Sequence, residues 1–188
     1  MLGGSVERLL EAIAEGAEAA GGIVTRFKCN EIQVKPCQSC GPEPTTGFCV
    51  FHDDMDPIYE ALRDAHAVAV GSPIYFDTVS GPLKLVMDRC NCITPLVHAP
   101  GGGFTFRPLW PRTRRGVFVT ALSSRHRHDL AEHSVRGFMK WIGTRWEETL
   151  AFAHDDEGLG SVVARPELLE HAREVGRRLI ESPPLVPS

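Results

Sequence analysis

A short apolar run at residues 67–71, with the sequence AVAVG, constrains the fold of this chain most. It is rich in valine and flanked by turn-forming residues, which is the pattern of a parallel strand buried inside a sheet. Ser72, Pro73, an aromatic pair and several small hydroxyl residues follow it, and a helix pattern begins at Pro82. A strand that leads through such a segment into a helix is typical of α/β ligand-binding proteins, whose ligands lie outside the carboxyl ends of the strands.

The segment after this strand carries side chains that suit a particular kind of ligand. Tyr75 offers a flat aromatic ring, and Ser72, Thr78 and Ser80 offer small hydroxyl groups. Together these groups favour a ligand with an aromatic ring and a polar tail. The competing interpretation is that Tyr75 is a core aromatic at a strand end, and we favour the ligand role.

The rest of the chain alternates helix and strand patterns. Helix patterns cover residues 5–20 with Ser5 as N-cap, 53–63 capped by Asp53 or Asp54, 82–91, 130–142 and a closing segment from Pro166; strand patterns cover 23–29, 67–70, 115–120 and 149–152. Residues 35–47 and 94–115 are rich in Pro and Gly and are predicted to be irregular. The resulting order, αβαβαβαβα, predicts one α/β domain with a parallel sheet and helices on both faces.

Composition excludes several classes of protein. The chain has 188 residues and a net charge of −4, so no strong field draws it to nucleic acid or anionic lipid. It contains no apolar stretch of the roughly 18 residues that a membrane span needs, and no signal-peptide pattern at its start. We therefore expect a cytoplasmic protein whose six cysteines are thiols or metal ligands rather than disulfides.

Several short motifs, taken together, resemble the NADPH-dependent FMN reductase family, and within it the iron–sulfur flavoprotein branch. They are KPCQSC at 35–40, GFCV at 47–50, SPIYF at 72–76, SGPLK at 80–84, DR at 88–89 and GSVV at 160–163. The resemblance covers most of the chain. It implies a flavodoxin-like three-layer αβα sandwich that binds FMN at the carboxyl ends of its strands.

The resemblance also implies which residues contact the FMN. The isoalloxazine and ribityl parts would be held by Ser72, Pro73, Ile74, Tyr75 and Phe76, with Ser80 and Gly81 lining the same pocket and Ala121, Leu122 and Ser123 flanking the ring from the other side; Ser5 would lie at the end of the phosphate-binding loop. After Leu122 this chain has SSRH at 123–126, where relatives have a glycine-rich loop.

The cysteine loop departs from the pattern of the relatives that carry a [4Fe–4S] cluster. Those relatives place four cysteines in a Cys-x2-Cys-x2-Cys-x4–7-Cys run, because thiolates must surround the cluster. Cys37, Cys40 and Cys49 match three of these positions, but Glu43 stands at the third. A carboxylate is a poor ligand for iron–sulfur, so we predict that no cluster is bound.

Other metal-ligand sets stay open beside this prediction. Three cysteines with an outside ligand could still hold a cluster, and Cys29 is the nearest candidate in the sequence. A zinc site would need His52 as the fourth ligand beside the three loop cysteines. His126, His128 and His133 form a further set, which we interpret as a solvated surface.

A flavodoxin-like chain normally opens with a strand and a phosphate-binding loop, and this sequence begins near the end of such a loop. The first strand, which is central in the strand order 2-1-3-4-5, is therefore expected to be missing. Two explanations stay open: the sequence was cut short at a wrong start codon, which we favour, or the chain is a degenerate relative that binds flavin weakly or not at all.

The resemblance implies an FMN-binding oxidoreductase that uses NAD(P)H to reduce flavin, a quinone or a similar small acceptor. Its expected partners are a small-molecule electron acceptor and further copies of itself, in a homodimer or higher oligomer that meets at the helix over 82–91. The alternatives are an electron-transfer iron–sulfur flavoprotein and a degenerate, non-catalytic module on the same fold.

Overall fold

The computed structural model describes residues 3–39, 48–110, 113–123, 127–154 and 160–182. Within them, the helices are α1 (Ser5–Ala19), α2 (Asp56–Asp64), α3 (Gly81–Arg89), α4 (Asp129–Trp141) and α5 (Pro166–Glu181), with short 3₁₀ turns η1 (Cys90–Ile93) and η2 (Ser161–Ala164). The strands are β1 (Ala67–Tyr75), β2 (Thr78–Val79), β3 (Leu96–His98), β4 (Phe104–Phe106), β5 (Arg114–Ser123) and β6 (Thr144–His154).

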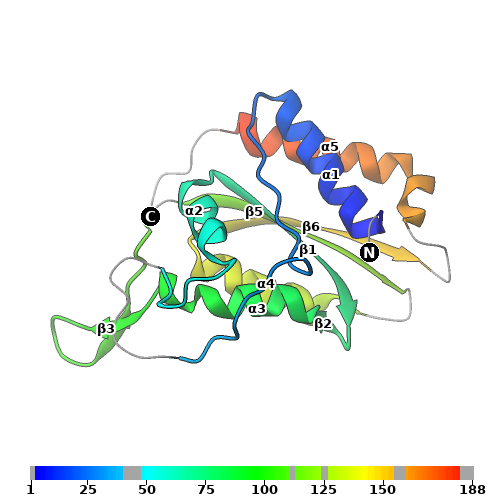
Figure 1. The fold of residues 1–188 in the computed structure, drawn as a ribbon. Helices are drawn as coiled ribbons and strands as arrows, with labels where there is room; N and C mark the ends of the chain where they lie inside the picture. The colour runs from blue at the N-terminus through cyan, green and yellow to red at the C-terminus, as the bar shows by residue number, and fades with distance from the viewer. Residues whose placement is uncertain (1–2, 40–47, 111–112, 124–126, 155–159, 183–188) are drawn as a thin grey trace.

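The main sheet has four strands in the order β2-β1-β5-β6 (Figure 1). Strands β1, β5 and β6 run parallel, as predicted, while β2 folds back antiparallel on the end of β1. Strands β3 and β4 form a separate antiparallel hairpin inside residues 94–115, a region predicted to be irregular. That part of the prediction was wrong, because its glycine triplet lies in the connection between two strands.

Helices cover both faces of the sheet, which confirms the predicted three-layer arrangement. Along β5, Val117 and Val119 pack into the core beneath α1 and α5, whereas Phe118 and Leu122 pack into the core with α2, α3 and α4. Successive side chains of a strand point to opposite faces, so β5 is buried on both sides. This is why its sequence is almost continuously apolar.

The predicted strand at 23–29 is wrong. The segment forms no regular element and pairs with no strand in the part of the chain that the structure describes, and Ile23 is fully exposed at 99%. Three ion pairs instead hold it against α1: Arg26–Glu11 at 2.8 Å, Arg26–Glu18 at 3.0 Å and Lys28–Glu7 at 2.8 Å. A strand forms only where a neighbour supplies backbone hydrogen bonds, and none is available here.

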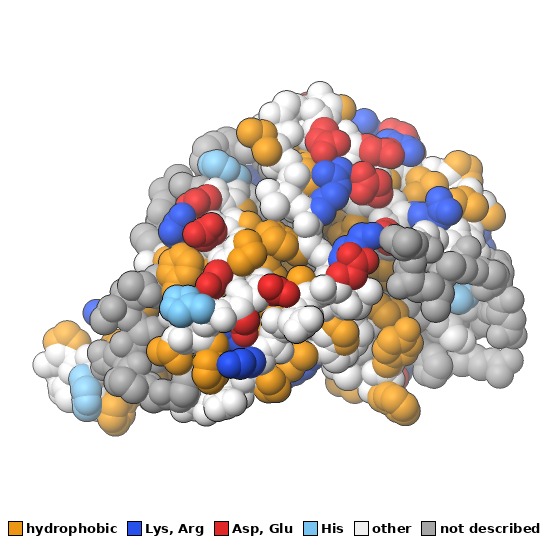
Figure 2. All heavy atoms as spheres, viewed as in Figure 1, with side chains coloured by type: hydrophobic (Ala, Val, Ile, Leu, Met, Phe, Trp, Pro, Cys, Tyr) orange, Lys and Arg blue, Asp and Glu red, His pale blue; other side chains and the backbone are white. Residues whose placement is uncertain are grey.

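One edge of β1 is open for most of its length. Strand β1 pairs with β5 over 67–73, and on its other side the described residues pair only at Ile74 and Tyr75, with β2. Ala69 is exposed, although its strand reads as a buried one. On the face shown in Figure 2, hydrophobic side chains gather across the middle of the molecule, below the charged surface of α1. Unpaired strand edges of this kind are templates for further pairing.

This open edge predicts a specific pattern of hydrogen exchange. About half of the β1 amides over 67–73 are expected to exchange much faster than those of β5, because alternate N–H groups of β1 face the open side. Amide exchange followed by mass spectrometry or NMR would measure both strands in one sample, with β5 as the internal control. Equal protection of the two strands would contradict the open edge.

The parallel strands are longer than predicted. Ser72 and Pro73 were expected in a loop but belong to β1, where they pair with Thr120 and Ala121. Ala121, Leu122 and Ser123 likewise belong to β5 rather than to a loop. Proline is tolerated here because β1 has a parallel neighbour on one side only.

Helix boundaries differ from the prediction by a few residues. Gly4, not Ser5, is the N-cap of α1. Helix α2 begins at Asp56 after the N-cap Met55, so neither Asp53 nor Asp54 caps it. Helix α3 ends at Arg89, and the chain continues as the 3₁₀ turn η1. The side chains that were predicted to cap α1 and α2, Ser5, Asp53 and Asp54, have hydrogen-bond partners elsewhere in the fold.

Candidate functional site

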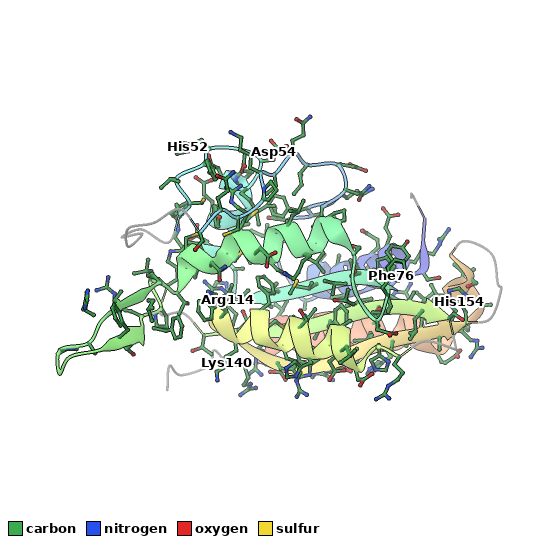
Figure 3. The ribbon with its side chains drawn as sticks, turned by 90° about the horizontal axis from the view of Figure 1, so that it is seen from below. His52, Asp54, Phe76, Arg114, Lys140 and His154 are labelled. Carbon is green, nitrogen blue, oxygen red and sulfur yellow. The ribbon has the colours of Figure 1, made fainter. Side chains whose placement is uncertain are left out.

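The carboxyl edge of the parallel strands brings the predicted flavin-contacting segments together. Ser72 and Pro73 of β1 lie in register beside Thr120 and Ala121 of β5. Beyond them, Ser123 ends β5 next to His154, which ends β6. Figure 3 shows Phe76 and His154 at this end of the molecule, with His52 and Lys140 at the other. Segments that lie 48 residues apart, as Ser72 and Thr120 do, and 31 residues apart, as Ser123 and His154 do, thus form one edge.

Ser72 ties three elements together at this edge. Its side chain is buried, and its hydroxyl oxygen accepts the N–H of Ser80 at 2.8 Å, with the Ser80 hydroxyl 3.3 Å away. The Thr120 hydroxyl donates to the carbonyl oxygen of Ser72 at 2.8 Å. Ser80 is the N-cap of α3 and Gly81 its first residue. Ser72 therefore fixes where α3 begins relative to β1 and β5, and its role as a direct flavin contact stays a prediction.

Two aromatic side chains stand open at the end of β1. Tyr75 is 58% exposed and Phe76 is 101% exposed, whereas Ile74 is buried in the core. The preceding strand pairs hold this segment rigidly, because Ile74 and Tyr75 pair with Val79 and Thr78. The ring of Tyr75 is therefore exposed to solvent, and its contact with a flat ligand stays a prediction.

His154 is a polar group of this edge that the sequence prediction missed. Its ring stacks on Phe152 at 5.5 Å, and its Nδ1 is buried with no hydrogen-bond partner among the described residues. The strand pattern was expected to end at Phe152, so His154 was not considered part of the edge. The register with Ser123 is the signal that places it there, and it depends on the sheet.

The amino end of α1 is already engaged by groups of the protein. The Ser5 hydroxyl accepts the N–H of Val162 at 3.3 Å, and the carboxylate of Glu7 accepts the N–H of Gly3. A hydrogen bond from Lys28 and that from Gly3 lower the pKa of Glu7, so this carboxylate is charged at neutral pH. Glu7 is itself paired with Lys28 at 2.8 Å, so the N–H groups of Gly3 and Val162 and the Glu7 carboxylate all have partners within the protein. The described residues thus fit the ring end of a flavin better than its phosphate.

Arg89 joins both ends of the cysteine loop at the opposite side of the molecule. Its guanidinium is 1% exposed and donates to the carbonyl oxygen of Lys35 at 2.9 Å and to that of Phe51 at 3.3 Å. It also pairs with the Asp53 carboxylate at 2.6 Å and lies over the Phe51 ring, 5.4 Å from its centroid. The segments before and after the loop are therefore fixed to the end of α3.

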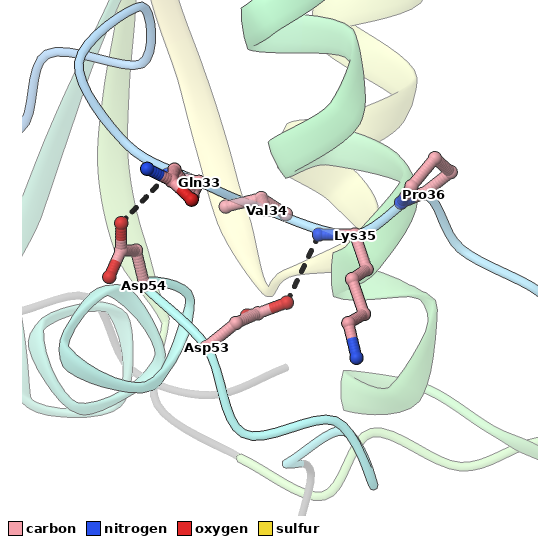
Figure 4. A pocket seen from close by; sticks show the side chains of 6 residues that line it. All are labelled: Gln33, Val34, Lys35, Pro36, Asp53 and Asp54. Atoms are coloured by element: carbon pink, nitrogen blue, oxygen red, sulfur yellow. Dashed lines mark hydrogen bonds between the residues drawn. The ribbon is translucent and has the colours of Figure 1, made fainter.

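The contacts of Arg89 with Asp53, Lys35 and Phe51 are called the Arg89 clasp below. A hollow of about 530 Å³ lies beside this clasp rather than at the carboxyl edge of the sheet. Figure 4 shows the six residues that line it: Gln33, Val34, Lys35, Pro36, Asp53 and Asp54. The Asp54 carboxylate accepts the N–H of Gln33 at 2.7 Å, and that of Asp53 accepts the N–H of Lys35 at 3.1 Å. Both carboxylates hold the protein's own backbone, so we interpret the hollow as part of the anchor for the loop.

The described cysteines do not gather into a metal centre. In the parts of the chain that the structure describes, no three His, Cys, Asp or Glu side chains lie in an arrangement that could hold a metal ion. Cys40 and Glu43 lie outside the described residues, as does His126, so the ligand sets that include them stay predictions, together with the roles of Cys37 and Cys49.

Two further cysteines, Cys90 and Cys92, lie at the end of α3. Burial raises the pKa of the Cys92 thiol to about 11, and burial also raises the pKa of Cys90. The Cys92 thiol donates to the carbonyl oxygen of Arg89 at 3.3 Å, which also accepts the Tyr59 hydroxyl at 2.7 Å. Because their pKa values are raised, these thiols stay protonated at neutral pH. The thiolate is the reactive form of cysteine, so we interpret both side chains as packing residues.

No helix in the described part of the chain is long and apolar enough to cross a bilayer.

Comparison with solved structures shows the fold. A flavone reductase superposes with a TM-score of 0.67 at 14% identity, covering 97% of this chain and 59% of that one. A flavodoxin from the domain Archaea superposes with a TM-score of 0.57 at 14% identity, covering 96% of this chain and 91% of that one. The fold is therefore flavodoxin-like.

Sequence comparison identifies the family. An iron–sulfur flavoprotein from Methanosarcina thermophila is 39% identical over 88 residues, which is 46% of this chain and 46% of that protein. The chain thus spans about half the length of the curated relatives that it matches. The family model for NADPH-dependent FMN reductases matches residues 2–153. The chain belongs to the NADPH-dependent FMN reductase family.

Proposed function

We propose that this protein is an FMN-binding oxidoreductase that takes electrons from NAD(P)H and passes them to a flavin, a quinone or a similar small acceptor. One observation carries the proposal: the ends of β1 and β5, which the family resemblance assigns to the flavin ring, lie side by side at one edge of the sheet. The family match over residues 2–153 supports it.

Bound FMN would supply the hydride and electron transfer. The residues at the edge would bind and orient it. Tyr75 would pack on the ring, and the backbone around Ser80 and Gly81, held in place by Ser72, would provide N–H donors at the start of α3. Such donors favour negative charge because the first N–H groups of a helix have no partner within it.

Titration of the purified chain with FMN tests this proposal. We expect a yellow complex whose visible flavin absorption is bleached by NAD(P)H, because the flavin takes up the electrons. Tyr75→Leu should weaken FMN binding about tenfold, because a ring stack contributes about 1.5 kcal/mol. Lys140→Ala, an exposed change at the other end of the molecule (Figure 3), is the matched control. A chain that binds no FMN, or equal affinity for FMN in both variants, would contradict the proposal.

The second candidate is an electron-transfer iron–sulfur flavoprotein. It is favoured by the similarity to the Methanosarcina iron–sulfur flavoprotein and by the anchoring of the cysteine loop through Arg89. Iron and sulfide analysis of protein purified without oxygen separates the two candidates. We propose the cluster-free form, because Glu43 replaces a thiolate.

We further propose a cytoplasmic homodimer that meets at α3. The exposed positions of this helix support it as a contact surface, since Gly81, Pro82 and Lys84 are exposed to solvent. Sedimentation of the purified chain measures the oligomeric state directly. A monomer at micromolar concentration would overturn this part of the proposal.

A further inference from the structure

The turn that joins β1 to β2 is strained at an unusual residue. Phe76 and Asp77 both have positive φ angles, of 51° and 62°. This left-handed conformation is the one that a tight hairpin turn between paired strands requires, and Gly or Asn normally supplies it. A bulky residue there is an outlier that persists only where the surroundings impose it. Strain of this kind is often found at functional sites.

The same residue is fully exposed. Phe76 contributes no burial to the fold, with 101% of its side-chain surface open, so its ring stabilises nothing in the described structure. The hairpin pairs on either side, Ile74 with Val79 and Tyr75 with Thr78, keep the turn tight. A glycine at this position would remove the strain at no cost in packing. Neither the turn nor the core therefore explains a phenylalanine here.

The position of Phe76 indicates what its ring can contact. Tyr75 is the last residue of β1, so a flat ring bound as the proposed function requires would meet Tyr75 first. Phe76 stands one residue further out, at the same edge of the sheet (Figure 3). A second flat molecule that lies against the outer face of the bound ring would meet the Phe76 side chain.

We propose that Phe76 forms one wall of the binding site for a planar electron acceptor, such as a quinone. This inference rests on the proposed function and names the residue that selects the acceptor. An aromatic wall favours flat, apolar rings through stacking and edge contacts. It gives no such advantage to a small hydrated anion. On this proposal Phe76 contacts the acceptor rather than the flavin to which the family resemblance assigns it, while the groups around Tyr75 and Ser80 serve the flavin.

The test compares two acceptors and two variants. In Phe76→Gly, kcat/KM for 1,4-naphthoquinone is expected to fall about tenfold relative to kcat/KM for ferricyanide, the loss of one ring contact. The melting temperature should rise, because glycine relieves the left-handed strain. Asp77→Gly is the matched control, since it relieves the neighbouring strain and leaves the ring in place. It should also raise the melting temperature but keep the ratio of the two acceptors.

Three outcomes would overturn the inference. An unchanged ratio in Phe76→Gly would show that the ring does not contact the acceptor. An equal loss with both acceptors, together with weaker FMN binding, would assign Phe76 to the flavin instead. A change in sedimentation with no change in the ratio would assign it to an interface between copies.

A binding measurement separates this inference from the proposed function. Saturation-transfer NMR with 1,4-naphthoquinone-2-sulfonate reports binding to the chain as isolated, without turnover. Phe76→Gly should weaken that binding several-fold relative to Asp77→Gly, and equal binding would overturn the inference. A chain that binds the quinone through Phe76 but shows no NAD(P)H-driven reduction would contradict the proposed function alone.

Discussion

Replacing Arg89 by methionine is expected to lower the free energy of unfolding by about 3–5 kcal/mol, because it leaves buried partners without their charge. Arg89 is 1% exposed, and its loss removes the hydrogen-bond donor of the Asp53 carboxylate and of the carbonyl oxygens of Lys35 and Phe51. Methionine keeps much of the volume, so the effect reports the lost hydrogen bonds. Urea unfolding followed by circular dichroism measures it.

Arg26→Gln is the matched control for this prediction. Arg26 pairs with Glu11 and Glu18, but its side chain is 42% exposed. Exposed ion pairs contribute about 0–1 kcal/mol, so the control should change stability little. A loss in Arg89→Met no larger than in the control would show that the clasp does not hold the loop.

The same ion pair makes stability depend on pH in a predictable direction. Burial acts to raise the pKa of Asp53, but hydrogen bonds from Arg89 and from the N–H groups of Lys35 and Met55 outweigh it and lower the pKa. A lowered folded-state pKa stabilises the fold above the unfolded value, roughly 3.9. That stability is lost as the pH falls through the lower folded value. Between pH 5 and pH 2 the wild type should therefore lose more stability than Arg89→Met.

Replacing Gly16 or Gly176 by alanine is expected to destabilise the protein by about 2–3 kcal/mol, the cost of overpacking a rigid contact. At Gly16 in α1 a Cβ atom would lie 1.9 Å from the carbonyl oxygen of Arg173, and at Gly176 in α5 it would lie 2.0 Å from that of Ile13. Both obstacles are helix backbone, which cannot move aside as a side chain can. The two helices would have to separate and expose the core between them.

Gly137→Ala provides the control, because it adds the same methyl group where no atom lies within 4 Å. Gly137 lies within α4, so alanine there should stabilise the protein by about 0.5–1 kcal/mol. Thermal unfolding of the three variants measures the contrast. The double variant at 16 and 176 should cost less than the sum of the single changes, because one separation of the helices relieves both overlaps. Stabilisation by either single change would contradict the close packing.

Much of the architecture follows from local sequence patterns. Two apolar runs, at 67–71 and 115–120, have the pattern of buried strands, and the segment from Pro166 has the period of an amphipathic helix. The structure contains all three elements. Their alternation was sufficient to predict the three layers. The ends of these elements were predicted less well, since Ser72 and Ala121 read as loop residues but are held in strands by their pairing.

The sequence by itself determined the helices, the three parallel strands and the family motifs, because these depend on residues close together in the chain. Only the tertiary structure decided the rest. Residues 23–29 have the composition of a strand but no neighbour to pair with in the described chain, and Arg89 became a clasp through partners 36 to 54 residues away. The edge formed by β1, β5 and β6 also depends on the register of distant segments. Local periodicity encodes which face of an element is apolar, whereas pairing and close contact depend on what the fold brings alongside.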